Sequence, residues 1–320
     1  MAPITLGFLT APHLPHLTPD DRLALPYLAA LGIQVRPVLW PDPSWETAHG
    51  REDLLNGLSA LVMRSCWGYH QDPVAFEHWL GLLQELTQAG LPVWNTPSTF
   101  RQNMHKSYLC DVEEAGHGIV PTVMLTGAAL LTTPRMALIE RLGCDAERAL
   151  VLKPAISASG EHTYLWKTNQ SPAFFVAETP ASQLWMVQPF VPSIATAGEY
   201  SLVFLGGQYS HCVRKLPAAR QFLVHEEHGG LTQFCVPAPE LLAAAQHLMH
   251  SPLKDTLLAD DLYLRLDYVW YEQQWCLMEI ERIEPSLYLA HDPQAPLRWA
   301  QHLHQNCLRF GLTLTGTHSL

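Results

Sequence analysis

The chain has 320 residues, of which 48% are hydrophobic, and it carries a formal net charge of -11 with only 19 lysines and arginines. This length and composition predict a globular chain of two or three domains and exclude a mainly disordered one. The excess of acidic residues argues against nucleic acid or an anionic membrane as the main partner, so we expect a small-molecule substrate.

No targeting signal or disulfide framework is expected. The first residues lack a basic segment before their short apolar run, and no later apolar run approaches the roughly 20 residues that a membrane span needs. The seven cysteines are scattered without a Cys-x-x-Cys pair, and no histidine lies in a His-Glu-x-x-His frame. We therefore expect a cytoplasmic protein with reduced thiols, either a monomer or a homodimer.

The first hundred residues predict strands that alternate with helices. Strands are expected within 4–10, 33–40, 60–67 and 91–95, and helices at about 20–31 and 73–89. Such alternation predicts a parallel sheet covered by helices. No Gly-x-Gly-x-x-Gly motif follows the first strand, so a dinucleotide site there is not expected. A further helix is expected from about Asn103 to Ala115, with Gly116 just beyond its end.

Beyond about residue 118 the pattern becomes rich in strands. They are expected within 148–156, 162–167, 184–191, 200–216 and 262–283, with a helix at about 238–250. The triplets Gly206-Gly207-Gln208 and Glu272-Gln273-Gln274 separate alternating runs, which is typical of hairpin turns. These changes of pattern predict three parts, residues 1–118, 119–190 and 191–320.

Lys153 is a candidate phosphate-binding residue. It ends an apolar run and precedes Pro154 and a stretch of small residues, 157–160, whose backbone amides would approach a phosphate closely. The lysine ammonium would neutralise the phosphate charge. The alternative is an ordinary lysine at the end of a strand before a turn.

The run 184–193 is a candidate adenine site. Pro189 and Pro192 interrupt it, which is expected to leave backbone groups around Gln188 and Phe190 unpaired by a sheet and free to bond an adenine edge. Glu199 follows at a position where its carboxylate would accept ribose hydroxyls. The alternative is a proline-interrupted edge strand without a ligand.

Strand periodicity places acidic residues on one face of a hairpin at 262–283. Asp267 shares a face with Tyr263 and Arg265, because the leucines at 262, 264 and 266 occupy the other face. If Glu272-Gln273-Gln274 is a three-residue loop, Tyr271 faces Trp275, and counting back pairs Asp267 with Glu279 and Arg265 with Glu281. Facing carboxylates repel, so a divalent cation bound with phosphate is the favoured interpretation. The alternative is a solvated acidic hairpin with Arg265 and Arg282 as partners.

The order of these features resembles the ATP-grasp superfamily, near prokaryotic glutathione synthetase. The order is Lys106, Lys153-Pro154 with its small-residue loop, Val187-Gln188-Pro189-Phe190, Lys215, Asp267 and Glu279-Ile280-Glu281. More closely, the chain is similar to the cyclo-ligase group of cycloserine biosynthesis through MRSCWGYH, WNTPSTFRQNMHKSYL, VLKPAISASG, GEYSLVFLGGQYSHCVRK, EEHGG and LMEIERIEPSLYL. The resemblance runs from about residue 60 to 290.

This resemblance implies an α/β (α+β) ATP-grasp fold with a Rossmann-like N-terminal domain, a small lid and a C-terminal ATP-binding domain. It implies ATP contacts from Lys106, Lys153, Ser157, Ser159, Gly160, Gln188, Pro189, Phe190 and Glu199. It further implies magnesium ligands at Asp267, Glu279 and Glu281, and charge stabilisation at the γ-phosphate by Lys215 with Arg214. Glu281 stands where glutathione synthetases usually carry asparagine.

The implied activity is that of an ATP- and Mg²⁺-dependent ligase that joins a small amino-acid-like substrate through a C–N bond. Arg64, Trp67 and Tyr69 are candidates for substrate binding, because ligands gather outside the carboxyl ends of parallel strands; packing of a loop is the alternative. Leu223 and Gly68 stand where relatives tend to carry an arginine and an acidic residue, which leaves the acceptor open. Competing hypotheses are a catalytically silent ATP-binding scaffold and a histidine-rich metal-binding protein.

Overall fold

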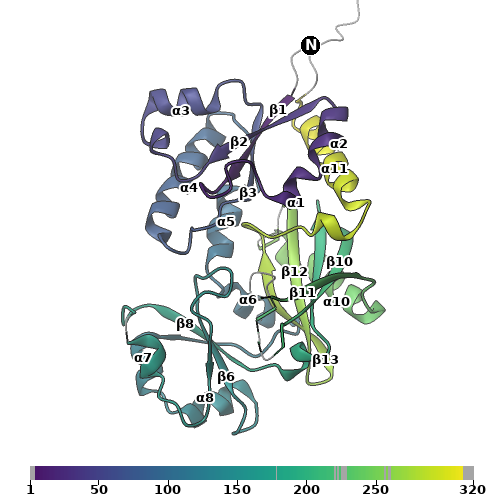
Figure 1. Cartoon of the computed structure of the whole chain (residues 1–320). Helices are drawn as coiled ribbons and strands as arrows, with labels where there is room; N and C mark the ends of the chain where they lie inside the picture. The colour runs from purple at the N-terminus through teal and green to yellow at the C-terminus, as the bar shows by residue number, and fades with distance from the viewer. Residues whose placement is uncertain are drawn as a thin grey trace, which may run out of the picture.

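The computed structural model describes residues 4–177, 179–219, 221, 223–224, 229–255, 257–258 and 261–312. These residues form three sheets: a parallel sheet near the N-terminus, an antiparallel sheet in the middle of the chain, and an antiparallel sheet nearer the C-terminus. In Figure 1 the C-terminal sheet lies between the N-terminal sheet above and the middle sheet below. The expectation of a mixed α/β chain is confirmed.

The N-terminal sheet has the strand order β2-β1-β3-β4 and is parallel throughout. Its strands are β1 (Ile4–Thr10), β2 (Ile33–Leu39), β3 (Ala60–Ser65) and β4 (Val93–Trp94). The helices of this part are α1 (Pro19–Arg22), α2 (Leu25–Ala30), η1 (Pro43–Glu46), α3 (Ala48–Leu55), α4 (Pro73–Gln88), α5 (Pro97–Met104) and α6 (Tyr108–Glu114). We call residues 4–114 the N-terminal body.

Two of the expected helices are each divided in two. The helix expected at 20–31 breaks between α1 and α2, because Pro26 has no N–H to donate to the carbonyl of Arg22. The helix expected at about 103–115 is divided between the last residues of α5 and the whole of α6. Gly116 follows α6 with φ of 85°, the left-handed conformation predicted for a residue that ends a helix.

The middle of the chain forms a small lobe, residues 123–189, which we call the lid. Its strands, in the order β5-β8-β6-β7, are β5 (Val123–Thr126), β8 (Leu184–Pro189), β6 (Leu150–Pro154) and β7 (Tyr164–Trp166). Its helices are α7 (Gly127–Thr132), α8 (Arg135–Leu142) and α9 (Ala173–Val176). The chain reaches the lid through residues 118–120, which pair with Leu277 beside the C-terminal sheet.

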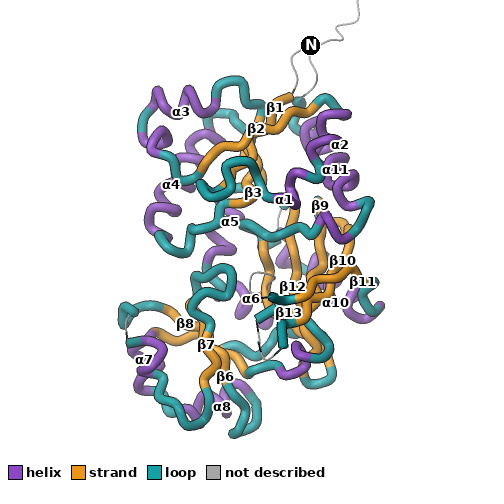
Figure 2. Tube along the Cα trace, in the orientation of Figure 1, coloured by secondary structure: helices purple, strands orange, loops and turns teal. Residues whose placement is uncertain are grey.

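The C-terminal sheet has the order β11-β10-β9-β12-β13 and is antiparallel. Its strands are β9 (Glu199–Leu205), β10 (Gln208–Leu216), β11 (Leu231–Cys235), β12 (Tyr263–Tyr271) and β13 (Gln274–Glu281), as Figure 2 shows in orange. Helix α10 (Pro239–Met249) packs on it through Leu241, Ala245 and Leu248. The remaining short helices are η2 (Pro192–Ala195), η4 (Pro252–Asp255) and η5 (Leu289–His291), and the long helix is α11 (Ala295–Arg309).

The hairpin of β12 and β13 has the predicted acidic pairs, but a different turn. The turn has two residues, Glu272 and Gln273, so Tyr271 pairs with Gln274 and the predicted pair of Tyr271 with Trp275 is wrong. A β-bulge adds one residue in β13 between the partners of Asp267 and Tyr268, and it shifts the register back. Asp267 therefore faces Glu279, and Arg265 faces Glu281, as predicted.

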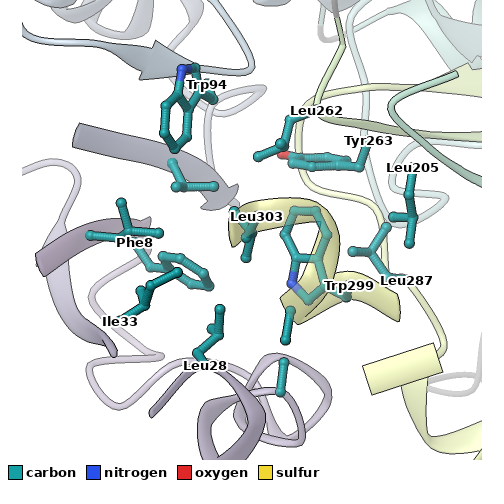
Figure 3. Close-up of a cluster of buried hydrophobic side chains, with 14 of the residues drawn as sticks. Phe8, Leu28, Ile33, Trp94, Leu205, Leu262, Tyr263, Leu287, Trp299 and Leu303 are labelled. Carbon is teal, nitrogen blue, oxygen red and sulfur yellow. The ribbon is translucent and has the colours of Figure 1, made fainter. Parts of the chain in front are cut away.

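The N-terminal body and the C-terminal sheet share one hydrophobic core. Figure 3 shows Trp299 and Leu303 of α11 between Phe8 and Leu28 on one side and Leu205 on the other. Helix α11 also packs against α2. Residues 295–309, which lie in the predicted third part, thus complete the core of the first.

None of the helices in the described ranges combines the length and the apolar character that a membrane span requires.

Candidate functional site

The N-terminal body, the lid and the C-terminal sheet all contribute to one cavity of about 270 Å³. Fourteen of the seventeen site residues predicted from the sequence line it, although they are spread over more than 200 positions of the chain. They are Trp67, Tyr69, Lys106, Lys153, Ser157, Ser159, Gly160, Gln188, Pro189, Phe190, Glu199, Asp267, Glu279 and Glu281. The cavity therefore brings together side chains of the N-terminal body, the lid and the acidic hairpin β12–β13.

Two lysines lie at the lid side of the cavity. Lys106, between α5 and α6, is buried; its Nζ donates to the carbonyl oxygen of Ser157 at 2.6 Å and lies 3.1 Å from Oε1 of Glu279. Lys153 extends from β6, and burial lowers its pKa while Glu279 acts in the opposite direction. Within the described part of the chain Lys153 makes no ion pair, so its charge is available to a ligand. Burial disfavours the charged form of Glu279, but Lys106 and Lys153 outweigh it and hold its pKa below the usual range.

The loop that follows Lys153 adopts the backbone conformation of a tight turn. Ser159 and Gly160 have φ of 52° and 69°, and the hydroxyl of Ser157 donates to the carbonyl oxygen of Pro154. Glu161 of the same loop contacts the N-terminal body, because its Oε2 lies 2.9 Å from Nε2 of His70. The loop is thus tied to the N-terminal body at both ends, through Lys106 and through His70.

Asp267 is the most heavily bonded carboxylate of the site. Its Oδ1 accepts from Nε of Arg265 at 2.9 Å and from the hydroxyl of Ser201 at 2.6 Å. Its Oδ2 accepts from Nη2 of Arg265 at 2.8 Å and from Nζ of Lys215 at 3.1 Å. A carboxylate has about four lone-pair sites, and all four of Asp267 are filled. Although burial disfavours ionisation, the two cations keep the pKa of Asp267 well below its usual range.

The two remaining acids differ in their partners. Glu281 accepts from Arg265, yet burial raises its pKa to about 7, with Asp267 and Glu279 adding to the effect. Glu199 pairs with Lys215, and burial likewise raises its pKa. Arg265 and Lys215 therefore link three carboxylates into one buried network of charges.

The predicted adenine segment is more fully paired than the sequence suggested. Strand β8 continues through Pro189, which pairs with Leu150 of β6, and the N–H of Phe190 donates to the carbonyl oxygen of Ala149 at 2.8 Å. The expectation that these backbone groups are unpaired by a sheet is therefore wrong. Pro189 lacks an N–H, but the residues on either side of it keep their backbone hydrogen bonds to the β6 side of the sheet. The side-chain amide of Gln188 donates to Oγ1 of Thr122, and its oxygen has no hydrogen-bond partner among the described residues.

Three predicted residues lie outside the cavity lining. Lys215 is buried behind it, bonded to the lining residues Glu199 and Asp267. Arg214 points to the opposite face of β10, where its guanidinium donates to the carbonyl oxygens of Thr196 and Ala197. Arg64 is 2% exposed and pairs with Asp21 at 2.8 Å, so it supports the packing of the N-terminal body.

Several lining residues were not among the predicted site residues. Arg265 shares the acidic face of β12, so the same periodicity that selected Asp267 also marks it. Glu284, Ser286 and Tyr288 follow the acids in the segment LMEIERIEPSLYL, but no strand pattern covers them. The side-chain amide of Asn103 bonds the backbone of Ile280 in β13 and of Arg282 just after it, which no sequence pattern indicates. Leu223, noted as a departure from relatives, also lines the cavity, whereas 226–228 of the EEHGG segment lie outside the described residues.

Of the three predicted magnesium ligands, Glu279 and Glu281 fit this role with their present contacts, and Asp267 does not. Where the chain is described, no three side chains of His, Cys, Asp or Glu converge on a ready-made metal site. However, Mg²⁺ commonly takes one or two protein carboxylates together with phosphate oxygens. Glu279 and Glu281 suit this arrangement, because each uses only Oε1 in its ion pair. Asp267 would become a ligand only if one of its present donors moved.

The chain matches known proteins over its N-terminal part and over the whole fold. Residues 6–95 match the family model "D-cycloserine synthetase DcsG, N-terminal domain". The cycloserine biosynthesis protein DcsG of Streptomyces lavendulae is 27% identical over 263 residues, which cover 76% of this chain and 82% of that protein. The crystal structure of D-cycloserine synthetase DcsG has a TM-score of 0.74 at 22% identity, covering 94% of this chain and 99% of that one. An ATP-grasp RimK domain protein from Sphaerobacter thermophilus has a TM-score of 0.64 at 15% identity, covering 93% and 98%.

The chain has the ATP-grasp fold. The expected ATP-grasp architecture and the resemblance to the cycloserine-synthetase type are thereby confirmed. The same matches support the predicted enzyme class, an ATP-grasp ligase. In ATP-grasp terms, the cavity lies where the lid, the C-terminal sheet and the N-terminal body meet.

Proposed function

We propose that this ATP-grasp ligase activates a carboxylate, or an equivalent acyl oxygen, of a small amino-acid-like substrate as a phosphate. The substrate oxygen attacks the γ-phosphorus and ADP leaves. An amine nitrogen, from the same molecule or a second one, then attacks the acyl carbon, the C–O bond to phosphate breaks, and the nitrogen loses a proton. The observation that carries the proposal is the convergence of Lys106, Lys153 and the Lys215–Arg265 network with three carboxylates at one cavity.

Lys153 and Lys106 would have different roles, because they differ in their present contacts. Lys153 has no ion pair among the described residues, so it would take a phosphate without breaking a contact. Lys106 would hold a second phosphate oxygen while it keeps Ser157 and Glu279 in place. The loop 157–160 would close over the phosphates, because its backbone is already tied to Lys106. Fixed cations around a transferring phosphoryl group stabilise the charge of its transition state.

Glu279 and Glu281 would hold magnesium, which when bound would neutralise charge on the phosphates. Lys215 would move from Asp267 toward the γ-phosphate, since Glu199 would still hold it. That movement would open one acceptor site on Asp267 for the metal. Arg214, on the opposite face of its strand, would support Gly198 and the start of β9 instead of contacting phosphate.

The nucleotide base would lie between the lid and the C-terminal sheet. Gln188, Pro189 and Phe190 line that end of the cavity, and the unpaired oxygen of the Gln188 amide is a candidate acceptor for an exocyclic amine. Glu199 would contact the ribose. A cytoplasmic location remains a prediction, and so does a small amino-acid-like molecule as the partner.

A phosphate-release screen tests the proposal. The chain would be incubated with Mg-ATP and a panel of compounds. The panel would contain small peptides, both enantiomers of serine and of alanine, and their ureido and aminooxy derivatives. Hydroxylamine would trap an activated acyl group as a hydroxamate. We expect release of phosphate that depends on one class of acceptor, and loss of both release and ATP affinity in Lys153→Met.

Lys167→Met is the matched control, because Lys167 is exposed in the lid and does not line the cavity. It should behave as the parent protein does. ATP binding without phosphate release from any panel member would instead favour a catalytically silent ATP-binding protein. Undiminished ATP affinity in Lys153→Met would refute the phosphate-binding role of that residue.

A further inference from the structure

Glu284 is the one carboxylate of the cavity lining that lacks a cation partner in the described part of the chain. The other four lining acids, Glu199, Asp267, Glu279 and Glu281, each form an ion pair with a lysine or an arginine. Burial raises the pKa of Glu284 well above its usual range, and Glu281 adds to the shift. A carboxylate in such surroundings gains stability when a cation enters beside it.

The segment that carries Glu284 is fixed against the N-terminal sheet. The hydroxyl of Tyr263 donates to the carbonyl oxygens of both Met63 and Ile283, and Nη2 of Arg64 donates to the carbonyl oxygen of Pro285 at 3.3 Å. Residues 283–285 are therefore held at the carboxyl end of β3. Ligands of open parallel sheets bind outside the carboxyl ends of the strands.

This part of the cavity lies on the side of the N-terminal body. Most candidate ATP contacts come from β6, the loop after it and β8 of the lid, together with Lys106 and Glu199, whereas Glu284 follows β13 and lies beside the loop after β3. Trp67 and Tyr69 of that loop, and Tyr288, line the cavity together with Glu284. Aromatic rings near a carboxylate are the surroundings that bind an ammonium group.

We propose that Glu284 binds the ammonium group of the acceptor substrate, so that the site selects molecules with a free amino group next to the acyl group that becomes activated. This inference rests on the proposed ligase function and adds the substrate feature that the cavity recognises. Glu284 would accept one or two hydrogen bonds from the ammonium, and the rings of Trp67 and Tyr69 would cover it. The acyl group of the same molecule would then point toward Glu281 and the phosphates.

The test compares amino substrates with their des-amino counterparts in the parent protein, Glu284→Gln and Glu284→Asp. Alanine is compared with propionate, serine with 3-hydroxypropionate, and each derivative that is active in the screen with its des-amino form. We expect the parent to prefer the amino form by about 100-fold in kcat/KM, as expected for a charge-assisted bond and its desolvated partner. In Glu284→Gln this preference should fall below roughly fivefold, chiefly through the KM of the acceptor, with the KM of ATP unchanged.

Two further variants keep the result interpretable. Glu240→Gln removes an exposed carboxylate in the first turn of α10 and should retain the parent's preference. Glu284→Asp keeps the charge and should show an intermediate preference, which a purely structural role would not produce. Because Glu284 has no described partner to lose, Glu284→Gln should also melt at or above the temperature of the parent.

Any result other than those expected refutes either the role of Glu284 or the proposed ligase function. If the parent uses des-amino compounds as well as amino compounds, or if Glu284→Gln keeps the preference or loses only kcat, the role of Glu284 is wrong while the ligase function stands. If no acceptor in the panel releases phosphate, the proposed function fails, and the role of Glu284 fails with it.

Discussion

Removing the charge of Asp267 should destabilise the protein, whereas removing that of Glu281 should hardly change its stability. The two acids lie on the same face of the hairpin and share Arg265, but only Asp267 fills all of its acceptor sites and also binds Lys215. In Asp267→Asn, the buried Arg265 and Lys215 lose their common partner, and such a loss typically costs about 3–5 kcal/mol of unfolding free energy. Because Lys215 keeps Glu199 and Arg265 keeps Glu281, we expect the lower end, about 3 kcal/mol.

Glu281→Gln should leave the unfolding free energy nearly unchanged or slightly higher in the protein without nucleotide. The pKa of Glu281 is already about 7, so near neutral pH much of its charge is lost, and Arg265 keeps both bonds to Asp267. Removing the remaining charge also relieves repulsion with Asp267 and Glu279, which lie on the same face of the hairpin. Both variants should nevertheless release little phosphate, because each disturbs the groups that surround the γ-phosphate.

Melting curves with and without Mg-ATP measure these differences. A loss of about 3 kcal/mol should lower the melting temperature of Asp267→Asn by roughly 6 °C, whereas Glu281→Gln should stay within about 2 °C of the parent. Mg-ATP at about 100 times its Kd should stabilise the parent by about 2.7 kcal/mol and Glu281→Gln by clearly less. Equal melting of Asp267→Asn and the parent would refute the charge network, and near-parent turnover of Glu281→Gln at limiting magnesium would refute its role as a metal ligand.

Three further predictions concern other parts of the chain. His211 is 1% exposed, between Ser210 and the carbonyl oxygen of Leu287 and near Arg298 and Asp292, and burial lowers its pKa to about 4. The unfolded chain therefore binds more protons than the folded one between about pH 4 and 6.5. The contribution of His211 to the unfolding free energy should be complete above this range and fall by up to about 3 kcal/mol as the pH decreases through it. Urea unfolding at several pH values should show a weaker pH dependence for His211→Gln than for the parent. Gln273 has φ of 64° in the two-residue turn, so Gln273→Gly should raise the unfolding free energy by about 1 kcal/mol, and an unchanged or lower melting temperature would contradict the strain. Glu161→Gln removes the contact with His70, so with Mg-ATP bound a protease should cleave within 157–163 roughly two- to fivefold faster than in the parent, and equal rates would show that this contact does not hold the loop.

The sequence predicted the acidic pairs because two local features of the hairpin compensate for each other. Alternation along β12 requires Asp267 and Arg265 on the face opposite the leucines, and burial of that other face makes the register strongly determined. The turn length was predicted one residue too long, and the bulge in β13 supplies the missing residue. Neither the bulge nor the turn type follows from alternation alone, since Glu272 and Gln273 are not residues that favour positive φ.

Other parts of the site depend on contacts between distant segments, which periodicity does not specify. Arg64 was a plausible ligand at the end of β3, but Asp21, 43 positions earlier, pairs with it and removes it from the cavity. Glu284 lies beyond the last strand, and its place at the cavity results from bonds that Tyr263 and Arg64 make to its neighbours. The pairing of Phe190 with Ala149 likewise needed the position of β6, 40 residues earlier.

Helix α11 has a consequence for the order in which the chain becomes folded during synthesis. Its residues Trp299 and Leu303 complete the core that Phe8, Leu28 and the rest of the N-terminal body begin. On a ribosome, residues 4–114 emerge long before 295–309 are made, so the apolar side of β1 stays without its cover during most of translation. The first part to be synthesised is therefore expected to be among the last to reach its native packing, and nascent chains that are stalled before residue 295 should present this surface to chaperones.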